Sequence, residues 1–103
     1  MGRARQFTFA SKHAVEGLTK AAALEVAESG VRVNVVAPGP IETGMLNRFT
    51  GNEDNKAALV SRVPVKRVGL PEEIAQAIVF VASDKASFIT GASIAVDGGK
   101  LAG

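Results

Sequence analysis

The sequence predicts an α/β fold in which a helix, a strand, a long loop, a second helix and a second strand follow one another. Apolar residues recur at helical spacing over residues 10–27 and again over residues 71–82. A run of mostly β-branched residues opens the segment 31–43, as is typical of a strand buried on both faces of a parallel sheet. A second short strand, residues 92–96, stops at Asp97-Gly98-Gly99, a sequence that indicates a tight turn.

The first helix, predicted over residues 10–27, has an amphipathic pattern. Val15, Leu18, Ala22 and Val26 share one face, as expected of a helix that covers a sheet. Gly30 follows at a position that suits a left-handed C-terminal cap. This periodicity indicates a scaffold element and no particular chemistry.

The first strand ends where the chain meets Pro38, Gly39 and Pro40, residues that cannot continue a central strand. The chain therefore leaves the sheet abruptly at a strand's carboxyl end, which is where open α/β sheets bind ligands. We expect the function to lie on this strand and its exit loop. Residues 42–55 then form a polar loop, which is expected to be functional or mobile, and residues 56–63 a short helix.

The second helix has a clear start at Pro71, because proline suits the first helical position. Glu72 and Glu73 suit the positive end of the helix dipole, and we interpret them as dipole residues rather than as a pair of catalytic carboxylates. Since this helix connects two strands, it predicts a right-handed crossover with the two strands parallel.

The composition is typical of one globular domain, which we place at residues 1–103, with 47% hydrophobic and 21% charged residues. A net charge of +2 and the lack of a basic run with aromatics predict no nucleic-acid partner. No apolar run is long enough to cross a membrane and no secretory signal follows the basic start, so we expect a cytoplasmic protein. With no cysteine and a single histidine, His13, we expect no metal site.

Four segments, in this order and at these distances, resemble the carboxyl-terminal half of the short-chain dehydrogenase/reductase family. They are residues 10–20 (ASKHAVEGLTK), 32–39 (RVNVVAPG) with Ile41 and Thr43, 67–75 (RVGLPEEIA) and 89–99 (ITGASIAVDGG). The resemblance implies a partial Rossmann-like, doubly wound fold. It also implies NAD or NADP as the cofactor, and oxidoreduction of a carbonyl or an alcohol. The substrate itself, and the choice between NAD and NADP, are not indicated.

The resemblance also implies roles for individual residues. Lys12 matches the lysine that holds the nicotinamide ribose and lowers the pKa of a catalytic tyrosine. Pro38, Gly39, Ile41 and Thr43 match the loop that meets the nicotinamide ring and its carboxamide. Residues 47–63 match the variable substrate loop.

Two departures from the family pattern point to a chain that is inactive alone. The family motif is Tyr-x-x-x-Lys, but Thr8 stands four residues before Lys12, and the chain contains no tyrosine. A threonine hydroxyl is far less acidic than a phenol, whose pKa is about 10, so Thr8 is not expected to act as the proton donor. The glycine fingerprint and the catalytic serine belong to an amino-terminal, cofactor-binding half that we expect to be absent here.

Whether the chain is itself an enzyme is therefore left open by the sequence. One alternative is a non-catalytic oligomerisation or assembly module, and another is one half of a split oxidoreductase. A two-stranded parallel sheet with an open edge is unlike a stable independent unit. We accordingly expect a homo-oligomer or a complex with the amino-terminal half, and a small-molecule substrate only if that partner completes the site.

Overall fold

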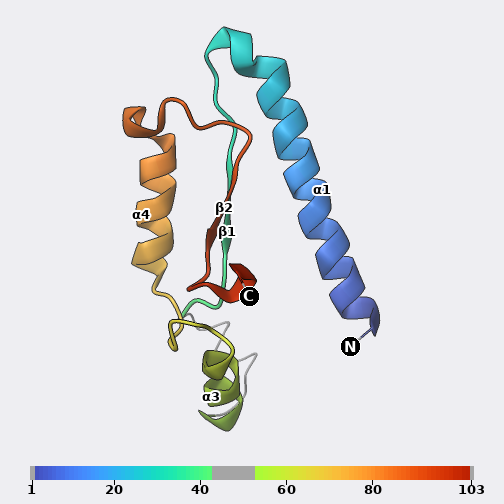
Figure 1. Cartoon of the computed structure of the whole chain (residues 1–103), viewed down its shortest axis with the longest axis vertical. Helices are drawn as coiled ribbons and strands as arrows, with labels where there is room; N and C mark the ends of the chain where they lie inside the picture. The colour runs from blue at the N-terminus through green and yellow to red at the C-terminus, as the bar shows by residue number, and fades with distance from the viewer. Residues whose placement is uncertain (1, 43–52, 103) are drawn as a thin grey trace. The chain divides into compact units, whose positions relative to one another are not determined.

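The computed structural model describes residues 2–42 and 53–102. The principal elements follow one another in the predicted order: α1 (Gly2–Val26), β1 (Val35–Pro38), α3 (Glu53–Ser61), α4 (Pro71–Ala82) and β2 (Ser93–Val96) (Figure 1). Three short 3₁₀ helices, η1 (Ala27–Ser29), η2 (Asp84–Ala86) and η3 (Lys100–Ala102), follow α1, α4 and β2.

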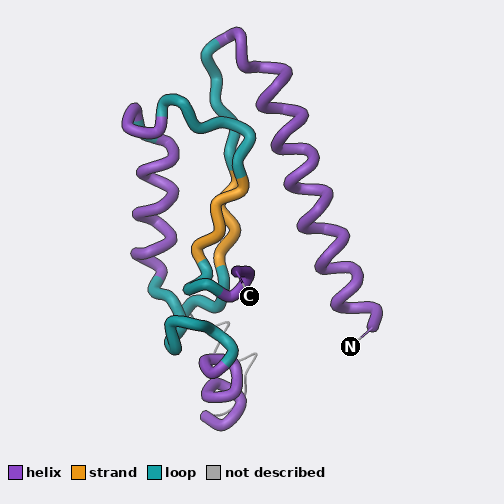
Figure 2. The backbone as a smooth tube through the Cα atoms, in the orientation of Figure 1, coloured by secondary structure: helices purple, strands orange, loops and turns teal. Residues whose placement is uncertain are grey.

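β1 and β2 form one two-stranded sheet and lie side by side, as the two orange segments of Figure 2 show. Val35 N donates to Ala92 O and Gly39 N donates to Val96 O, each at 3.0 Å. Because the residue number rises along both strands from one bond to the next, the strands are parallel. The predicted α/β class with two parallel strands is confirmed.

The chain divides into two compact units, which we describe separately. The first comprises Met1–Val35 and Ser83–Ile94, and the second comprises Val36–Ala82 and Ala95–Gly103. The assignment of residues 1–103 to a single domain stays a prediction.

In the first unit, α1 begins eight residues earlier than predicted, and it ends one residue earlier, at Val26. Gly30 is left-handed, with φ of 82°, and its N–H donates to Ala27 O, so the predicted left-handed cap is confirmed, although it closes η1, which follows α1, and not α1 itself. The buried face of α1 is not the predicted one, so that prediction is wrong. Leu18 is 72% exposed, whereas Thr19 and Ala23 are buried. The small side chain of Ala23 lets the backbone approach closely at Gly91, where an added Cβ would lie 3.4 Å from the Ala23 Cβ.

The segment before β1 is held by the backbone hydrogen bond from Gly91 N to Val33 O, at 2.7 Å, and by several side chains. Asn34 Nδ2 donates to Ile89 O at 2.9 Å, and Asn34 Oδ1 accepts from Ala92 N at 3.0 Å. Val33 N donates to the Thr90 hydroxyl oxygen at 3.1 Å. Arg32 donates to Ile89 O and Ser83 O. These bonds explain why the strand starts at Val35 and not at residue 31.

β1 differs from prediction in two further ways. It is half-buried and not buried, since its residues are intermediate or exposed. It also includes Pro38 as its last residue. The bonds from Val35 N and Gly39 N to β2 show that odd-numbered amides face the partner strand. The missing N–H of Pro38 therefore faces away from β2 and removes no bond of this ladder.

In the second unit, α4 has the predicted bounds. β2, whose first two residues belong to the first unit, starts one residue later than predicted, at Ser93. α3 starts three residues earlier than the predicted 56–63 helix and ends two residues earlier, at Ser61. Val63 and Val81 are buried here. Val63 packs beneath the turn after β2, because a Cβ added to Gly98 would lie 2.7 Å from Val63 Cγ1.

We predict that Asn34→Ala lowers the free energy of unfolding by about 1–3 kcal/mol, because the Ala92 amide loses its acceptor and Ile89 O loses a donor. Chemical denaturation at fixed protein concentration measures this change. Gln76→Ala removes an exposed amide on α4 and serves as the control, with an expected change within about 0.5 kcal/mol. Equal effects of the two substitutions would contradict the bridging role of Asn34.

Candidate functional site

The candidate site lies where both parallel strands of the sheet end. β1 runs into Gly39, Pro40 and Ile41, and β2 runs into Asp97 and Gly98. A hollow of about 130 Å³ opens at this place within the second unit. Its walls combine the residues after both strands with the segment that leads into α4: Pro40, Ile41, Arg67, Glu73, Asp97 and Gly98. This is the end of an α/β sheet at which ligands bind.

Position 39 needs glycine because there is no room for a side chain. Its backbone angles do not require glycine, since its φ is not positive. A Cβ at this position would lie 2.7 Å from the Cβ of Asp97 and 2.8 Å from its Cα. The second contact is with backbone, so a larger residue would force the ends of β1 and β2 apart. Glycine is therefore needed at this strand exit, and the close approach of Asp97 is the cause.

Asp97 organises the turn after β2. Its Oδ1 accepts from Gly99 N at 2.9 Å, and its Oδ2 accepts from Leu101 N at 3.3 Å. Gly98 and Gly99 both have positive φ, of 64° and 91°. The predicted tight turn is thus confirmed, and the aspartate side chain fixes the backbone that forms one wall of the hollow.

Ile41 continues from the strand into a second pairing. It forms an isolated parallel bridge with Gly69, in which Gly69 N donates to Pro40 O and Glu42 N donates to Gly69 O, both at 2.8 Å. Glu42 also forms an ion pair with Lys56, its Oε2 lying 2.7 Å from Nζ. The exit loop is therefore tied to the start of α4 and to α3.

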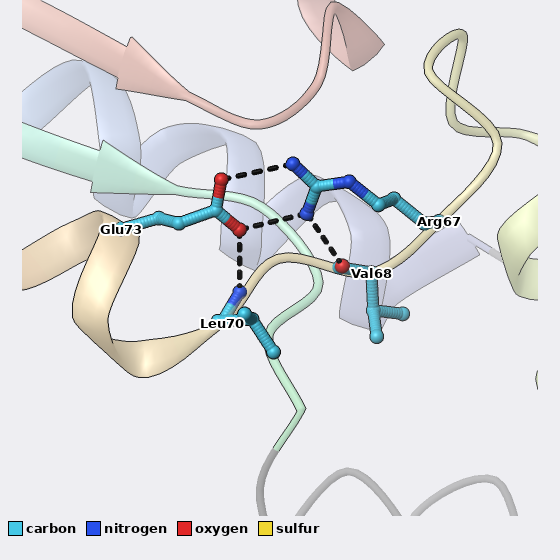
Figure 3. Close-up of polar contacts among 4 residues, drawn as sticks. All are labelled: Arg67, Val68, Leu70 and Glu73. Atoms are coloured by element: carbon cyan, nitrogen blue, oxygen red, sulfur yellow. Dashed lines mark hydrogen bonds and ion pairs between the residues drawn. The ribbon is translucent and has the colours of Figure 1, made fainter.

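Arg67 and Glu73 form a bidentate ion pair beside this bridge (Figure 3). Arg67 Nη1 lies 2.7 Å from Glu73 Oε1, and Nη2 lies 2.9 Å from Oε2. Glu73 Oε1 also accepts from Leu70 N at 2.9 Å, as the third residue of a helix does in a capping box. The hydrogen bonds from Arg67, then the one from Leu70 N, lower the pKa of Glu73 to about 2.

Sequence reasoning missed this ion pair. It assigned Glu73 to the helix dipole, which covers only part of its role. Glutamate at the third helical position was the available signal for the bond to Leu70 N. Nothing in the spacing of Arg67 and Glu73 indicated that the preceding turn would bring the guanidinium onto the carboxylate.

The predicted site residues lie in different parts of the chain. Pro38, Gly39 and Ile41 lie together at the strand exit. Lys12 is exposed on α1, in the first unit, which is described separately. Thr8 also belongs to α1. Thr43, and most of the predicted polar loop over residues 42–55, fall outside the described residues.

His13, next to Lys12, is exposed, and its ring packs edge-on against Phe9 with ring centroids 4.3 Å apart. Across residues 2–42 and 53–102 there is no cluster of three or more side chains able to bind a metal ion. Within the same ranges, no helix is both long and apolar enough to cross a membrane.

The chain resembles known proteins over almost its whole length. Residues 2–100 match the family model described as enoyl-(acyl carrier protein) reductase. The chain is 51% identical over 100 residues to the 3-oxoacyl-(acyl-carrier-protein) reductase FabG of Vibrio harveyi, which covers 96% of this chain and 40% of that protein. It is 45% identical to the cis-4-hydroxycyclohexanecarboxylate dehydrogenase of Sinomonas cyclohexanicum, over 99% of this chain and 41% of that one.

Solved structures also resemble this chain. A protein from Agrobacterium tumefaciens, solved with bound NADP, superposes on 91% of this chain and 38% of its own, with a TM-score of 0.84 and 44% identity. The 4-hydroxyisoleucine dehydrogenase complexed with NADH covers 91% of this chain and 39% of its own, with a TM-score of 0.85 and 39% identity.

Together, the strand order, the exit loop and these matches define a Rossmann-type α/β protein. The chain belongs to the short-chain dehydrogenase/reductase family. It spans 34–41% of the length of the curated relatives that it matches.

We predict that Glu73 stays ionised until the pH falls to about 2, because Arg67 and Leu70 N stabilise its carboxylate. Carbon NMR of the side-chain carboxyl measures this directly. A lowered pKa stabilises the fold fully above the ordinary value of 4.5, and this contribution is lost as the pH falls from 4.5 towards 2. Arg67→Met should move the midpoint back towards 4.5; a midpoint that is the same with and without the guanidinium would contradict the ion pair.

Proposed function

We propose that this chain supplies the nicotinamide side of an NAD(P) site in an oxidoreductase that interconverts carbonyls and alcohols. One observation carries the proposal: in a member of this family, the described residues form a hollow at the carboxyl ends of two parallel strands. The cofactor, when bound, accepts or delivers the hydride. The residues proposed to contact it are Lys12, Pro38, Gly39, Ile41 and Thr43.

The dimensions of the hollow fit one end of a dinucleotide and not the whole. At about 130 Å³ it is smaller than the roughly 300–1,000 Å³ of typical ligand pockets. Pro40 and Ile41 provide an apolar wall suited to a flat ring, and the neighbouring backbone provides polar groups. The 103 residues contain no glycine-rich fingerprint for a pyrophosphate. We therefore propose that another segment or chain holds the phosphates.

Proton transfer is the second part of the proposal. Lys12 is exposed on α1, where its ammonium can meet a ribose, and Thr8 stands one helical turn before it. Thr8 offers an alcohol where the family motif has a phenol. Because an alcohol is too weak an acid for this work, the chain as it stands is proposed to reduce no ketone even when the cofactor is held.

Exposed apolar side chains support the proposal that this chain binds a partner. Phe7, Leu18 and Leu24 on α1 are between 72% and 81% exposed, and Phe88 is fully exposed. Exposed apolar residues that gather into a contiguous patch are typical of a surface that another chain covers. We propose that the partner is either a second copy of this chain or an amino-terminal half of the family fold, and that the latter completes the cofactor site.

We predict that Thr8→Tyr confers ketone reduction when the chain is mixed with the amino-terminal part of the Vibrio harveyi reductase. The phenol restores an acid of suitable pKa beside Lys12. The rate should exceed that of the Thr8 mixture by about 100-fold or more, as expected for adding a general acid. Oxidation of NADPH or NADH, followed by absorbance with an acetoacetyl thioester, measures it.

Two matched variants control this experiment. Thr8→Phe supplies the ring without the proton and should remain inactive. In the Thr8→Tyr background, Lys12→Met should abolish the gain, whereas Lys20→Met, which removes another exposed lysine of α1, should preserve it. A Thr8→Tyr mixture that binds cofactor but stays inactive would overturn the proposed role of this helix.

A second candidate function is that of a non-catalytic assembly module, and the exposed apolar residues of α1 favour it. Light scattering of the chain, alone and mixed with the amino-terminal half, together with an NADH titration separates the two. A defined oligomer that neither binds NADH nor joins an amino-terminal half would support the module. A chain that forms a one-to-one complex with that half, with cofactor binding appearing only then, would support the oxidoreductase.

A further inference from the structure

Arg67 and Glu73 close the turn before α4 into a ring of polar contacts. Besides its two bonds to Glu73, Arg67 Nη1 donates to Val68 O at 3.2 Å, and Glu73 Oε1 accepts from Leu70 N (Figure 3). We name the Arg67 and Glu73 side chains, with the backbone groups of Val68 and Leu70, the 67–73 clasp. The backbone contacts lie on either side of Gly69, so the clasp fixes the peptide groups that flank this glycine.

Gly69 is also the residue that holds the exit loop of β1. Its N–H donates to Pro40 O, and its carbonyl accepts from Glu42 N. The contact is tight, because a Cβ added to Gly69 would lie 2.8 Å from Ile41 Cδ1 and 4.0 Å from Glu73 Oε1. The position of residues 40–42 therefore depends on where the clasp holds Gly69.

A ligand-binding role for Arg67 fits the geometry less well. Both of its terminal nitrogens already donate to the Glu73 carboxylate, which also neutralises the charge. Exposed ion pairs generally add little to the free energy of folding. The value of a bidentate pair at this place is its directionality, since a guanidinium fork and a carboxylate meet in one defined geometry.

We propose that the 67–73 clasp is a positioning device that presets the loop of Pro40 and Ile41 for the nicotinamide end of the cofactor. The identity of the ligand rests on the proposed function. The coupling between the clasp and the loop does not depend on that function. Arg67 and Glu73 are positioning residues, which act on the cofactor through Gly69 and Ile41. Losing the clasp loosens the loop while the strands and α4 remain in place.

The coupling is tested first in the chain without cofactor. Amide hydrogen exchange reports the two bonds of the bridge, at Gly69 N and Glu42 N. Glu73→Gln keeps an oxygen for Leu70 N but removes the charge, and it should speed exchange at both amides by about tenfold. Glu72→Gln removes the same charge from the same helical turn outside the clasp and should leave both amides unchanged. Val35 N and Gly39 N, in the sheet, should be unaffected by either variant.

Arg67→Lys provides a second variant if Glu73→Gln does not fold. It keeps the positive charge but loses the fork, so exchange should lie between that of the parent chain and that of Arg67→Met. Unchanged exchange at Gly69 and Glu42 in a folded clasp variant would overturn the proposal. So would equal acceleration by Glu72→Gln, because a general loss of negative charge at the helix start would then explain the effect.

The role of the loop in cofactor binding is tested in the complex of the Thr8→Tyr chain with the amino-terminal part of the Vibrio harveyi reductase. Glu73→Gln should raise the cofactor KM by about tenfold and change kcat by less than about twofold, because a mispositioned loop weakens binding in the ground and transition states alike. Faster exchange together with an unchanged KM would support the coupling and overturn the assignment of the loop to the cofactor. Failure of the positioning role and failure of the proposed function are thus distinguishable.

Discussion

The hydrogen bonds between residues 33–39 and residues 91–96 are the constraint on which the candidate site depends. Gly91 N donates to Val33 O and Val35 N donates to Ala92 O in the first unit, and Gly39 N donates to Val96 O in the second. Since the strands are parallel, both exit turns emerge at the same edge of the sheet. A hollow between the residues that follow two strands is a consequence of this direction, and an antiparallel pair would place the two exits at opposite ends.

Close packing gives the hollow at this edge of the sheet a defined shape. Gly39 lies against the backbone of Asp97, and Gly98 lies against Val63 and Val65. Asp97 binds the amides of its own turn, while Gly69 pairs with the loop beyond β1. Each wall of the hollow is therefore fixed by short-range backbone contacts and not by a large core. Only four hydrophobic residues among those described are buried: Ala23, Val63, Val81 and Ala86.

The sequence predicted the features that depend on local chemistry. Pro71 and the two glutamates located α4, Gly30 located the end of the first helical segment, and Asp97-Gly98-Gly99 located the turn after β2. The ordered motifs identified the family. Features that depend on tertiary contacts were predicted less well. The helix face at Leu18 was assigned from hydropathy, whereas the buried positions, Thr19 and Ala23, are those small enough to pack closely.

Only part of the site was predicted, because some of its features depend on local chemistry and others on tertiary contacts. The strand exit before Ile41 was predicted from the local chemistry of proline and glycine, whereas the close approach of Asp97 that requires Gly39 is a tertiary contact. The bridge from Ile41 to Gly69 joins residues far apart in sequence, and the ion pair of Arg67 with Glu73 needs the turn between them to be folded. Periodicity and spacing carry no information about either contact. The roles of Lys12 and Thr43 rest on family resemblance and stay predictions.

We propose that the strand exits of this chain meet the nicotinamide end of a dinucleotide. The decisive experiment is NMR of the isotope-labelled chain in complex with the unlabelled amino-terminal part of the Vibrio harveyi reductase, titrated with NADH. We expect shifts at the amides of Gly39, Ile41 and Gly69 that are absent when only the adenosine diphosphate ribose portion is added. Saturable NADH binding to the complex with no change at these amides would contradict it.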